Sequence, residues 1–163
     1  MSWPESTLWM ELGHWGDIPP GLPPVGYRIR FYRIGDAKAW TDIQRESDTY
    51  NVFSDRTFDE QYPAPEDVRQ QRIFFAEDAG GQPVGTSSAW FGKDGETGRH
   101  GLVHWVAVIP AHQRRGVGRA LLAHTLREMS RWHQGALLCT DTNRKEAVKL
   151  YEDFGFTRST AAP

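Results

Sequence analysis

The sequence predicts an α+β fold: a mixed α/β sheet, mostly antiparallel, that is flanked by helices and contains one parallel strand pair. The first observation is an apolar strand over His100–Ile109 that stops at Pro110. The second is a basic, glycine-containing turn, Gln113–Ala120, that runs directly into an amphipathic helix ending near His133. The third is a continuous apolar strand, Ala136–Thr140, which we expect to be buried on both faces. A strand, a helix and a second strand in this order predict a parallel pair with a right-handed crossover.

Composition limits the classes of function. The 163 residues suggest one domain, and 19 basic against 21 acidic side chains give a net charge of −2, which argues against a nucleic-acid binder. The single cysteine, Cys139, excludes an internal disulfide and a multi-cysteine metal site, so we expect a reducing, cytoplasmic location. No apolar run approaches the roughly 20 residues that a membrane span needs, and the N-terminus lacks a signal-peptide pattern. No histidine spacing typical of metal enzymes is present, so no metal is predicted.

The elements before residue 100 complete the expected sheet. We interpret residues 1–26 as an N-terminal arm and residues 27–163 as the main domain. Within the arm, Thr7–His14 alternates as a short strand does, and Gly16–Pro24, with four prolines, is an extended connection. Further strands with alternating or apolar patterns are predicted at Tyr27–Ile34, Arg72–Glu77 and Gln82–Phe91.

Helix boundaries are predicted from capping residues. Asp36 is expected to cap a helix that begins at Ala37. Asn143, followed by Glu146 at the capping-box spacing, is expected to cap the last helix. Glycines are expected to end the last two helices, and a short strand follows the second of them. Gly135 is expected to end the long helix that follows the glycine turn, and Gly155 the last helix. The short strand after Gly155 is expected at Phe156–Ser159.

The turn before the first long helix is suited to an anion. Gly116 and Gly118 let the backbone approach an anion without an obstructing Cβ, and N–H groups at a helix N-terminus can point at phosphate oxygens. Positive charge is added by Arg114, Arg115 and Arg119. A P-loop needs Gly-Lys followed by Ser or Thr, which is absent, and a dinucleotide fingerprint needs a glycine where Leu121 stands. Both absences disfavour a nucleotide-binding protein.

Two motifs carry a resemblance to a known family. Gln113, Gly116 and Gly118 fill the fixed positions of a Q/R-x-x-G-x-G/A loop, so the chain resembles the GNAT superfamily of N-acyltransferases at its acyl-CoA pyrophosphate loop. Asn143–Phe156 is similar to that family's N-x-x-A-x-x-L/F-Y-x-x-x-G-F pattern. The resemblance covers about residues 27–158, and the two motifs occur in the expected order.

The resemblance implies an N-acetyltransferase that moves an acetyl group from acetyl-CoA, its acyl-donor cosubstrate, to a primary amine by direct attack. In that family acyl-CoA lies in a splayed gap between the two parallel strands. The amides of its pantetheine arm pair there with unpaired backbone groups. The implied cofactor-binding residues are Val106, Val108, Gln113, Arg114, Arg115, Gly116, Val117, Gly118, Arg119 and Asn143.

Tyr151 matches the family tyrosine and is the implied catalytic acid. A phenol with a pKa of about 10 is protonated at neutral pH and can donate to the leaving thiolate, although a tyrosine packed in an apolar stripe is the alternative. His104, on the central strand, is the candidate base because a pKa near 6.5 suits proton removal. A water relay and a purely structural histidine stay open, and His100 and His112 are weaker candidates. Cys139 is expected to pack rather than to act as a nucleophile.

The acceptor and the assembly are less defined. Acidic and aromatic side chains over residues 40–62, with the loop at 90–99, suit a cationic amine, although a solvated helix face explains most of the acids. Family members usually have one more strand after the last helix. Thr7–His14 is therefore expected to supply a sheet-edge strand, in its own chain or in a partner, and the second case would give a homodimer. A non-catalytic acyl-CoA sensor and a nucleotide-binding protein are the alternatives to an enzyme, and a sensor would lack Tyr151.

Overall fold

The computed structural model describes residues 4–160, and the chain forms two compact units. We name them the β1–β6 unit and the β2–β3 unit after the strand pairs that they contain. The β1–β6 unit comprises residues up to 19, 89–104 and from 126 onward, and the β2–β3 unit comprises 20–88 and 105–125. Strands β4 (Pro83–Phe91) and β5 (His100–Val108) each contribute residues to both.

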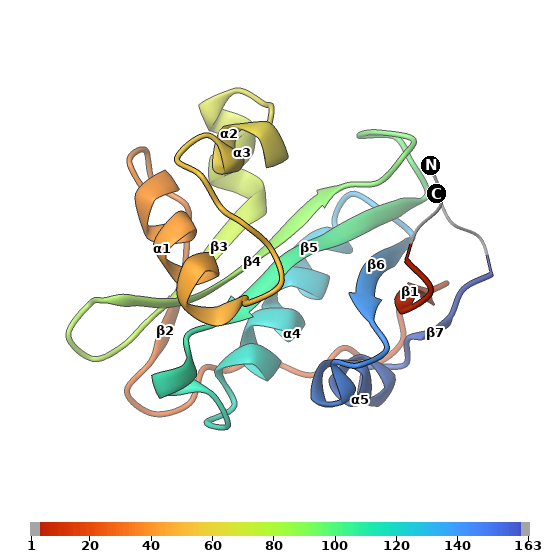
Figure 1. Cartoon of the computed structure of the whole chain (residues 1–163). Helices are drawn as coiled ribbons and strands as arrows, with labels where there is room; N and C mark the ends of the chain where they lie inside the picture. Colours follow the sequence, from red (N-terminus) through yellow and green to blue (C-terminus); the bar gives the residue numbers. More distant parts are fainter. Residues whose placement is uncertain (1–3, 161–163) are drawn as a thin grey trace. The chain divides into compact units, whose positions relative to one another are not determined.

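Seven strands make one sheet in the order β2-β3-β4-β5-β6-β1-β7 (Figure 1). The other strands are β1 (Thr7–Leu12), β2 (Arg28–Phe31), β3 (Ile73–Glu77), β6 (Gly135–Asp141) and β7 (Thr157–Arg158). Antiparallel ladders join β1 to β6 and β7, and β3 to β2 and β4, whereas β5 and β6 run parallel. The predicted mixed, mostly antiparallel sheet with a parallel pair is confirmed.

The β2–β3 unit has an aromatic core. Its helices are α1 (Ala37–Ser47), α2 (Thr57–Gln61), α3 (Glu66–Arg72) and the first part of α4 (Val117–Met129). The fully buried aromatic side chains are Trp40, Phe58, Tyr62, Phe74 and Phe75. Their burial explains why a segment with many acidic residues still folds against the sheet, because each large aromatic ring contributes on the order of 2 kcal/mol when it leaves water.

Asp36 stands at the N-cap position of α1, as predicted, but its side chain caps no N–H group of that helix. The carboxylate instead accepts a hydrogen bond from the backbone N–H of Arg33 at 2.6 Å and pairs with Arg30 at 2.7 Å. Arg30 also pairs with buried Glu77, so the guanidinium is held at this position by two carboxylates. The predicted side-chain cap is therefore wrong, because a charged partner on β2 competes for the carboxylate.

In the β1–β6 unit, β1 lies between two other strands (Figure 1). It pairs with β6 from Thr7↔Asp141 to Leu12↔Ala136, and with β7 at Met10↔Arg158. The predicted N-terminal strand is confirmed within its own chain. The prediction that it forms the sheet edge is wrong, because β7 pairs along its outer side.

The end of α4 differs from the prediction, whereas the end of α5 agrees with it. Helix α4 ends at Met129, and Gly135 belongs to β6, where its N–H donates to the carbonyl of Arg99 at 3.1 Å. Gly135 is therefore not a helix cap as predicted. Gly155, which follows α5 (Lys145–Asp153), has a φ of +93°, so the predicted left-handed end is confirmed there.

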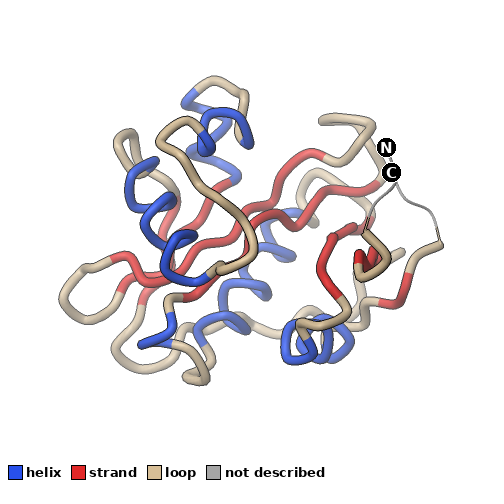
Figure 2. The backbone as a smooth tube through the Cα atoms, in the orientation of Figure 1, coloured by secondary structure: helices blue, strands red, loops and turns tan. Residues whose placement is uncertain are grey.

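The segment between β1 and β2 is loop throughout, as its prolines predict (Figure 2). Within the β1–β6 unit it is tied by Trp15, whose indole N–H donates to the carbonyl of His133 at 2.7 Å. Within the β2–β3 unit, Gly21 lies against Ala123 of α4 so closely that a side chain at 21 would clash. Among the described helices, none combines the length and the apolar character that crossing a membrane requires.

Candidate active site

Strand β5 carries a backbone irregularity at Trp105, whose φ of +52° places a non-glycine residue in the left-handed region. Its carbonyl oxygen accepts a hydrogen bond from Gln44 Nε2 of α1 at 3.2 Å, and its indole Nε1 donates to Gln61 Oε1 of α2 at 2.9 Å. The indole ring meets Trp40 and Phe53 edge-on, with ring centroids 5.9 and 5.5 Å away. The alternating pattern of the sequence did not predict this irregularity, and no local signal could have revealed its two glutamine partners.

The parallel ladder between β5 and β6 is short. It has three residue pairs, from His100↔Gly135 to Leu102↔Leu137. Both strands continue past it, β5 to Val108 and β6 to Asp141. The parallel ladder therefore ends before either of its strands does.

The loop that follows β5 is closed by Gln113. After the short helix η1 (Pro110–His112), the side-chain Nε2 of Gln113 donates to the carbonyl of Val108 at 2.8 Å. Arg114 and Gly116 both have positive φ, +60° and +85°, so the loop turns sharply at two points. Gln113, the first residue of the predicted motif, therefore holds the loop against the end of β5.

The first turn of α4 is electropositive and open. It contains no acidic residue, and the three neighbouring arginines of the motif are exposed: Arg114, Arg115 and Arg119. A Cβ at Gly118 would lie 3.7 Å from Val108 Cγ2, which is an ordinary contact, so packing within the protein does not demand glycine there. The N–H groups and the dipole of a helix N-terminus favour an anion at such a place.

Two residues that precede β2, Pro24 and Tyr27, touch the same loop. The hydroxyl of Tyr27 and Nδ1 of His112 lie 2.7 Å apart in a hydrogen bond, and the two rings meet edge-on. A Cβ on Gly116 would lie 3.4 Å from Pro24, so the arm also covers one side of the glycine turn. His112, a weaker base candidate, is thus bonded to Tyr27. Sequence reasoning missed Tyr27, because 85 positions separate it from its partner.

The loop between β6 and α5 lies in the β1–β6 unit and holds Asn143. The Asp141 carboxylate accepts hydrogen bonds from the hydroxyl of Ser6 at 2.6 Å and from the backbone N–H of Asn143 at 2.8 Å. These bonds lower the pKa of Asp141 below its usual value, with the Ser6 bond the largest cause. The N-cap residue of α5 is Arg144 and makes no side-chain cap. The predicted capping role of Asn143 is wrong, since Asp141 turns the chain first, and the Asn143 side chain is exposed.

Tyr151 lies on the buried side of α5 and packs edge-on against Phe156. Burial raises the pKa of Tyr151 to about 12, while the positive charge of Arg144 acts in the opposite direction. The phenol is therefore protonated throughout the neutral range. Burial also raises the pKa of Tyr32 to about 12 in the β2–β3 unit, so a raised pKa does not by itself mark a catalytic tyrosine.

The predicted base candidates on β5 differ in their surroundings. Burial lowers the pKa of His104 to about 4, so the imidazole is neutral at pH 7. His100, at the start of the strand, lies with Nε2 2.9 Å from Glu11 of β1. His104 and the β6–α5 residues lie in the β1–β6 unit, whereas Val106 and Val108 belong with the glycine loop in the β2–β3 unit.

His104 should make the stability of the protein depend on pH. The unfolded chain binds a proton at His104 below about pH 6.5, whereas the folded chain does so only near pH 4, so acid favours unfolding. We expect His104→Gln to remove up to about 3 kcal/mol of the fall in unfolding free energy between pH 6.5 and pH 4. Urea titrations at a series of pH values measure this, with exposed His14→Gln as the control. Parallel pH curves for His104→Gln and the original chain would contradict the assignment.

One further prediction needs correction, and the surroundings of the segment 40–62 can now be described. Cys139 is exposed rather than packed, because β6 is buried on both faces only in its first residues; burial and Asp141 nevertheless raise the pKa of its thiol. In the segment 40–62, the aromatic rings of Trp40, Phe53, Phe58 and Tyr62 are buried in the core, whereas Tyr50 is exposed. Several acids of that segment pair with basic side chains of the same unit, as Lys38–Asp42, Arg45–Asp55 and Arg69–Asp59 show.

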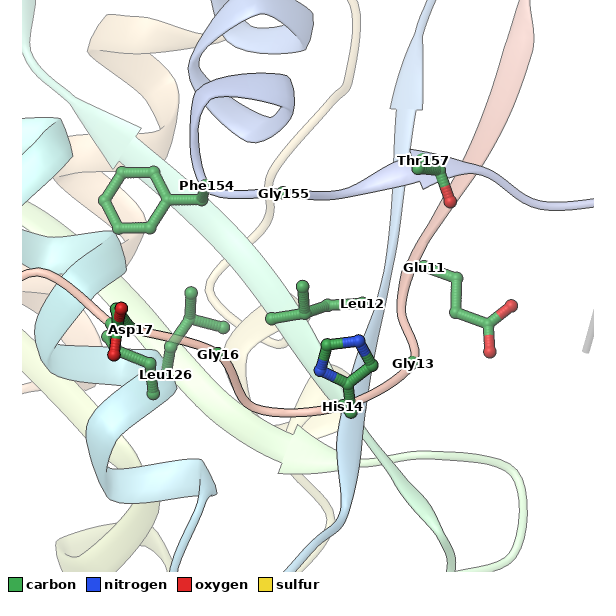
Figure 3. A pocket seen from close by; sticks show the side chains of 11 residues that line it. Glu11, Leu12, Gly13, His14, Gly16, Asp17, Leu126, Phe154, Gly155 and Thr157 are labelled. Carbon is green, nitrogen blue, oxygen red and sulfur yellow. The ribbon is translucent and has the colours of Figure 1, made fainter.

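A pocket of about 310 Å³ lies in the β1–β6 unit (Figure 3). Phe154, Asp17 and Leu126 lie on one side of it, and Glu11 and Thr157 on the other. None of the predicted site residues lines it, so it does not belong to the candidate set. Among the described residues, no group of three or more His, Cys, Asp or Glu is arranged to hold a metal ion.

Known acetyltransferases are similar to this chain in sequence. A mycothiol acetyltransferase from Thermobispora bispora is 30% identical over 88% of this chain, which covers 50% of that protein. An L-methionine sulfoximine/L-methionine sulfone acetyltransferase from Salmonella typhimurium is 29% identical over 83% of this chain and 82% of its own. The chain spans about half the length of the curated mycothiol acetyltransferases that it matches.

The fold is also that of a solved structure. A GCN5-related N-acetyltransferase from Sphaerobacter thermophilus superposes with a TM-score of 0.78 at 20% identity, over 94% of this chain and 48% of its own. The sequence profile of the Acetyltransferase (GNAT) family matches residues 37–156, which include β5, the glycine loop and α5. Because the match spans well over half of the chain, the chain belongs to the GNAT acetyltransferase family.

Proposed function

We propose that this chain is an N-acetyltransferase that transfers an acetyl group from acetyl-CoA to a primary amine by direct attack. The observation that supports this most is the glycine loop between β5 and α4. Gln113 closes it onto Val108, and the first turn of α4 is free of acidic residues. The loop lies within the residues that match the GNAT profile, so we propose that the anion it binds is the diphosphate of coenzyme A.

The residues present fit that group. Gly118 leaves space that the fold itself does not need, and Arg114, Arg115 and Arg119 are exposed around the turn. When bound, acetyl-CoA supplies a thioester carbonyl as the electrophile. Backbone groups of Val106 and Val108, the side chain of Asn143 and Val117 at the start of α4 complete the binding set by resemblance.

The two proton transfers of the reaction suggest roles for Tyr151 and His104. The attacking amine must lose a proton, and the leaving thiolate must gain one. Tyr151 holds a phenolic proton with a pKa of about 12 and serves as the acid. His104 is neutral at pH 7 and can accept a hydrogen bond, but its pKa of about 4 makes it a weak base. We therefore favour a route in which water carries the amine proton and His104 orients that water.

For the acceptor, we propose the amine of a small molecule rather than that of a protein. The names of a mycothiol acetyltransferase and of an L-methionine sulfoximine/L-methionine sulfone acetyltransferase, which match most of the chain, support this. A [ribosomal protein bS18]-alanine N-acetyltransferase from Escherichia coli matches only 34% of the chain. The internal pairing of Asp42, Asp55 and Asp59 weakens the case for a strongly acidic acceptor pocket.

The experiment that tests the proposal has two stages. Calorimetry compares acetyl-CoA with NADH, and we expect binding of acetyl-CoA only. Thiol release is then followed over a panel of amines that contains aminosugars, amino-acid derivatives and peptides. Acetyl-CoA binding without release on any amine would favour the non-catalytic sensor, and binding of NADH alone would overturn the assignment.

A further inference from the structure

The peptide that follows Trp105 is held in an unusual orientation. A non-glycine residue with a φ of +52° has a strained backbone, and such a conformation persists only where its surroundings fix it. Trp105 stands inside β5, a strand that has no glycine between Leu102 and Val108. An extended residue at this position would have continued the strand without backbone strain.

Two glutamines fix this residue from two helices. Gln44 of α1 donates from Nε2 to the Trp105 carbonyl at 3.2 Å, and Gln61 of α2 accepts from the Trp105 indole at 2.9 Å. The Gln44 side chain is only 2% exposed and lies on the same helix as the buried Trp40. A buried amide is costly unless it is hydrogen-bonded, so an apolar residue would be the simpler choice for packing alone.

The direction of one N–H group follows from these contacts. A trans peptide unit is planar, and its C=O and N–H groups point in opposite directions. The Gln44 bond fixes the Trp105 carbonyl toward α1, so the Val106 N–H of the same peptide unit points away from α1. We infer that Gln44 and Gln61 are positioning residues that set the Trp105–Val106 peptide for the acyl thioester. This inference rests on the proposed function of the chain.

The two glutamines act with opposite polarity, which gives a sharp test. Gln61 accepts a hydrogen bond, so Gln61→Glu keeps the contact and Gln61→Met removes it. Gln44 donates, so Gln44→Met removes its contact. We expect both methionine variants to lower kcat about tenfold, with a KM for acetyl-CoA within about twofold of the original, and Gln61→Glu to restore most of kcat.

A matched control separates positioning from stability. Tyr62→Phe removes a buried hydrogen bond to Ser88 Oγ, 2.9 Å long, from the same aromatic core. We expect it to lower the melting temperature about as much as the methionine variants do, while leaving kcat unchanged. In a Trp105→Phe background, which lacks the indole donor, Gln61→Met should have no further effect on kcat.

The outcomes are distinguishable. If the unsubstituted chain binds no acetyl-CoA, the proposed function fails. If it binds and turns over but both methionine variants keep full kcat, the positioning role is overturned and the proposed function stands. Equal loss of kcat in Gln61→Glu and Gln61→Met, or in Tyr62→Phe and the methionine variants, also overturns the positioning role.

Discussion

Tyr151→Phe is expected to lower kcat about 100-fold while the Kd for acetyl-CoA changes less than about threefold. The phenol is the proposed proton donor, and its pKa of about 12 keeps it protonated over the whole assay range. The phenyl ring preserves the edge-on contact with Phe156, so the fold should tolerate the change. Steady-state kinetics and calorimetry on the same preparation measure the two quantities.

The control for this substitution is Tyr32→Phe. Tyr32 is also buried and has a pKa of about 12, yet it lies in the core of the β2–β3 unit beside Phe58. We expect it to cost stability and leave kcat unchanged. Unaltered turnover in Tyr151→Phe would remove the acid role and leave Tyr151 as a packing residue of α5.

Gly118→Asp is expected to raise the Kd for acetyl-CoA about 100-fold without destabilising the free protein. A carboxylate in the first turn of α4 complements the helix dipole and stabilises the free chain by about 0.3–1 kcal/mol. The same charge would repel a diphosphate bound at that turn. Calorimetry gives the affinity, and thermal unfolding without ligand gives the stability.

Gly118→Asn isolates the charge, since asparagine has nearly the shape of aspartate. We expect it to weaken binding far less than aspartate does, and a rise in ionic strength to reduce the difference between the two variants. Equal weakening by both would show that the first turn of α4 does not hold the anion. Gly116 is unsuited to this test, because its φ of +85° makes any side chain there strain the loop.

The local part of this structure could be predicted from the sequence. Alternation and apolar runs located the strands, and the glycine turn located the start of α4 to within one residue. These features depend on neighbours in the chain, so the sequence carries them directly. The left-handed end of α5 at Gly155 belongs to the same class.

Contacts between distant residues could not be predicted. Asp36 occupies the N-cap position of α1, yet Arg30 of β2 holds its carboxylate in an ion pair instead. Gln44 and Gln61 look like ordinary polar helix residues until Trp105, more than 40 positions away, brings them together. Such competition depends on which partners the fold delivers, and no pattern within one segment records it.

The pairing of β1 with β6 affects how the chain folds during synthesis. Every residue pair in that ladder joins positions at least 124 apart (136 − 12), which gives the protein a high contact order there. During synthesis β1 leaves the ribosome on the order of 10 s before β6 is available to pair with it. Its buried face, with Leu8 and Met10, is exposed to other chains in that interval. The rate of translation should therefore affect the yield of folded protein, and we expect misassembly to begin at β1.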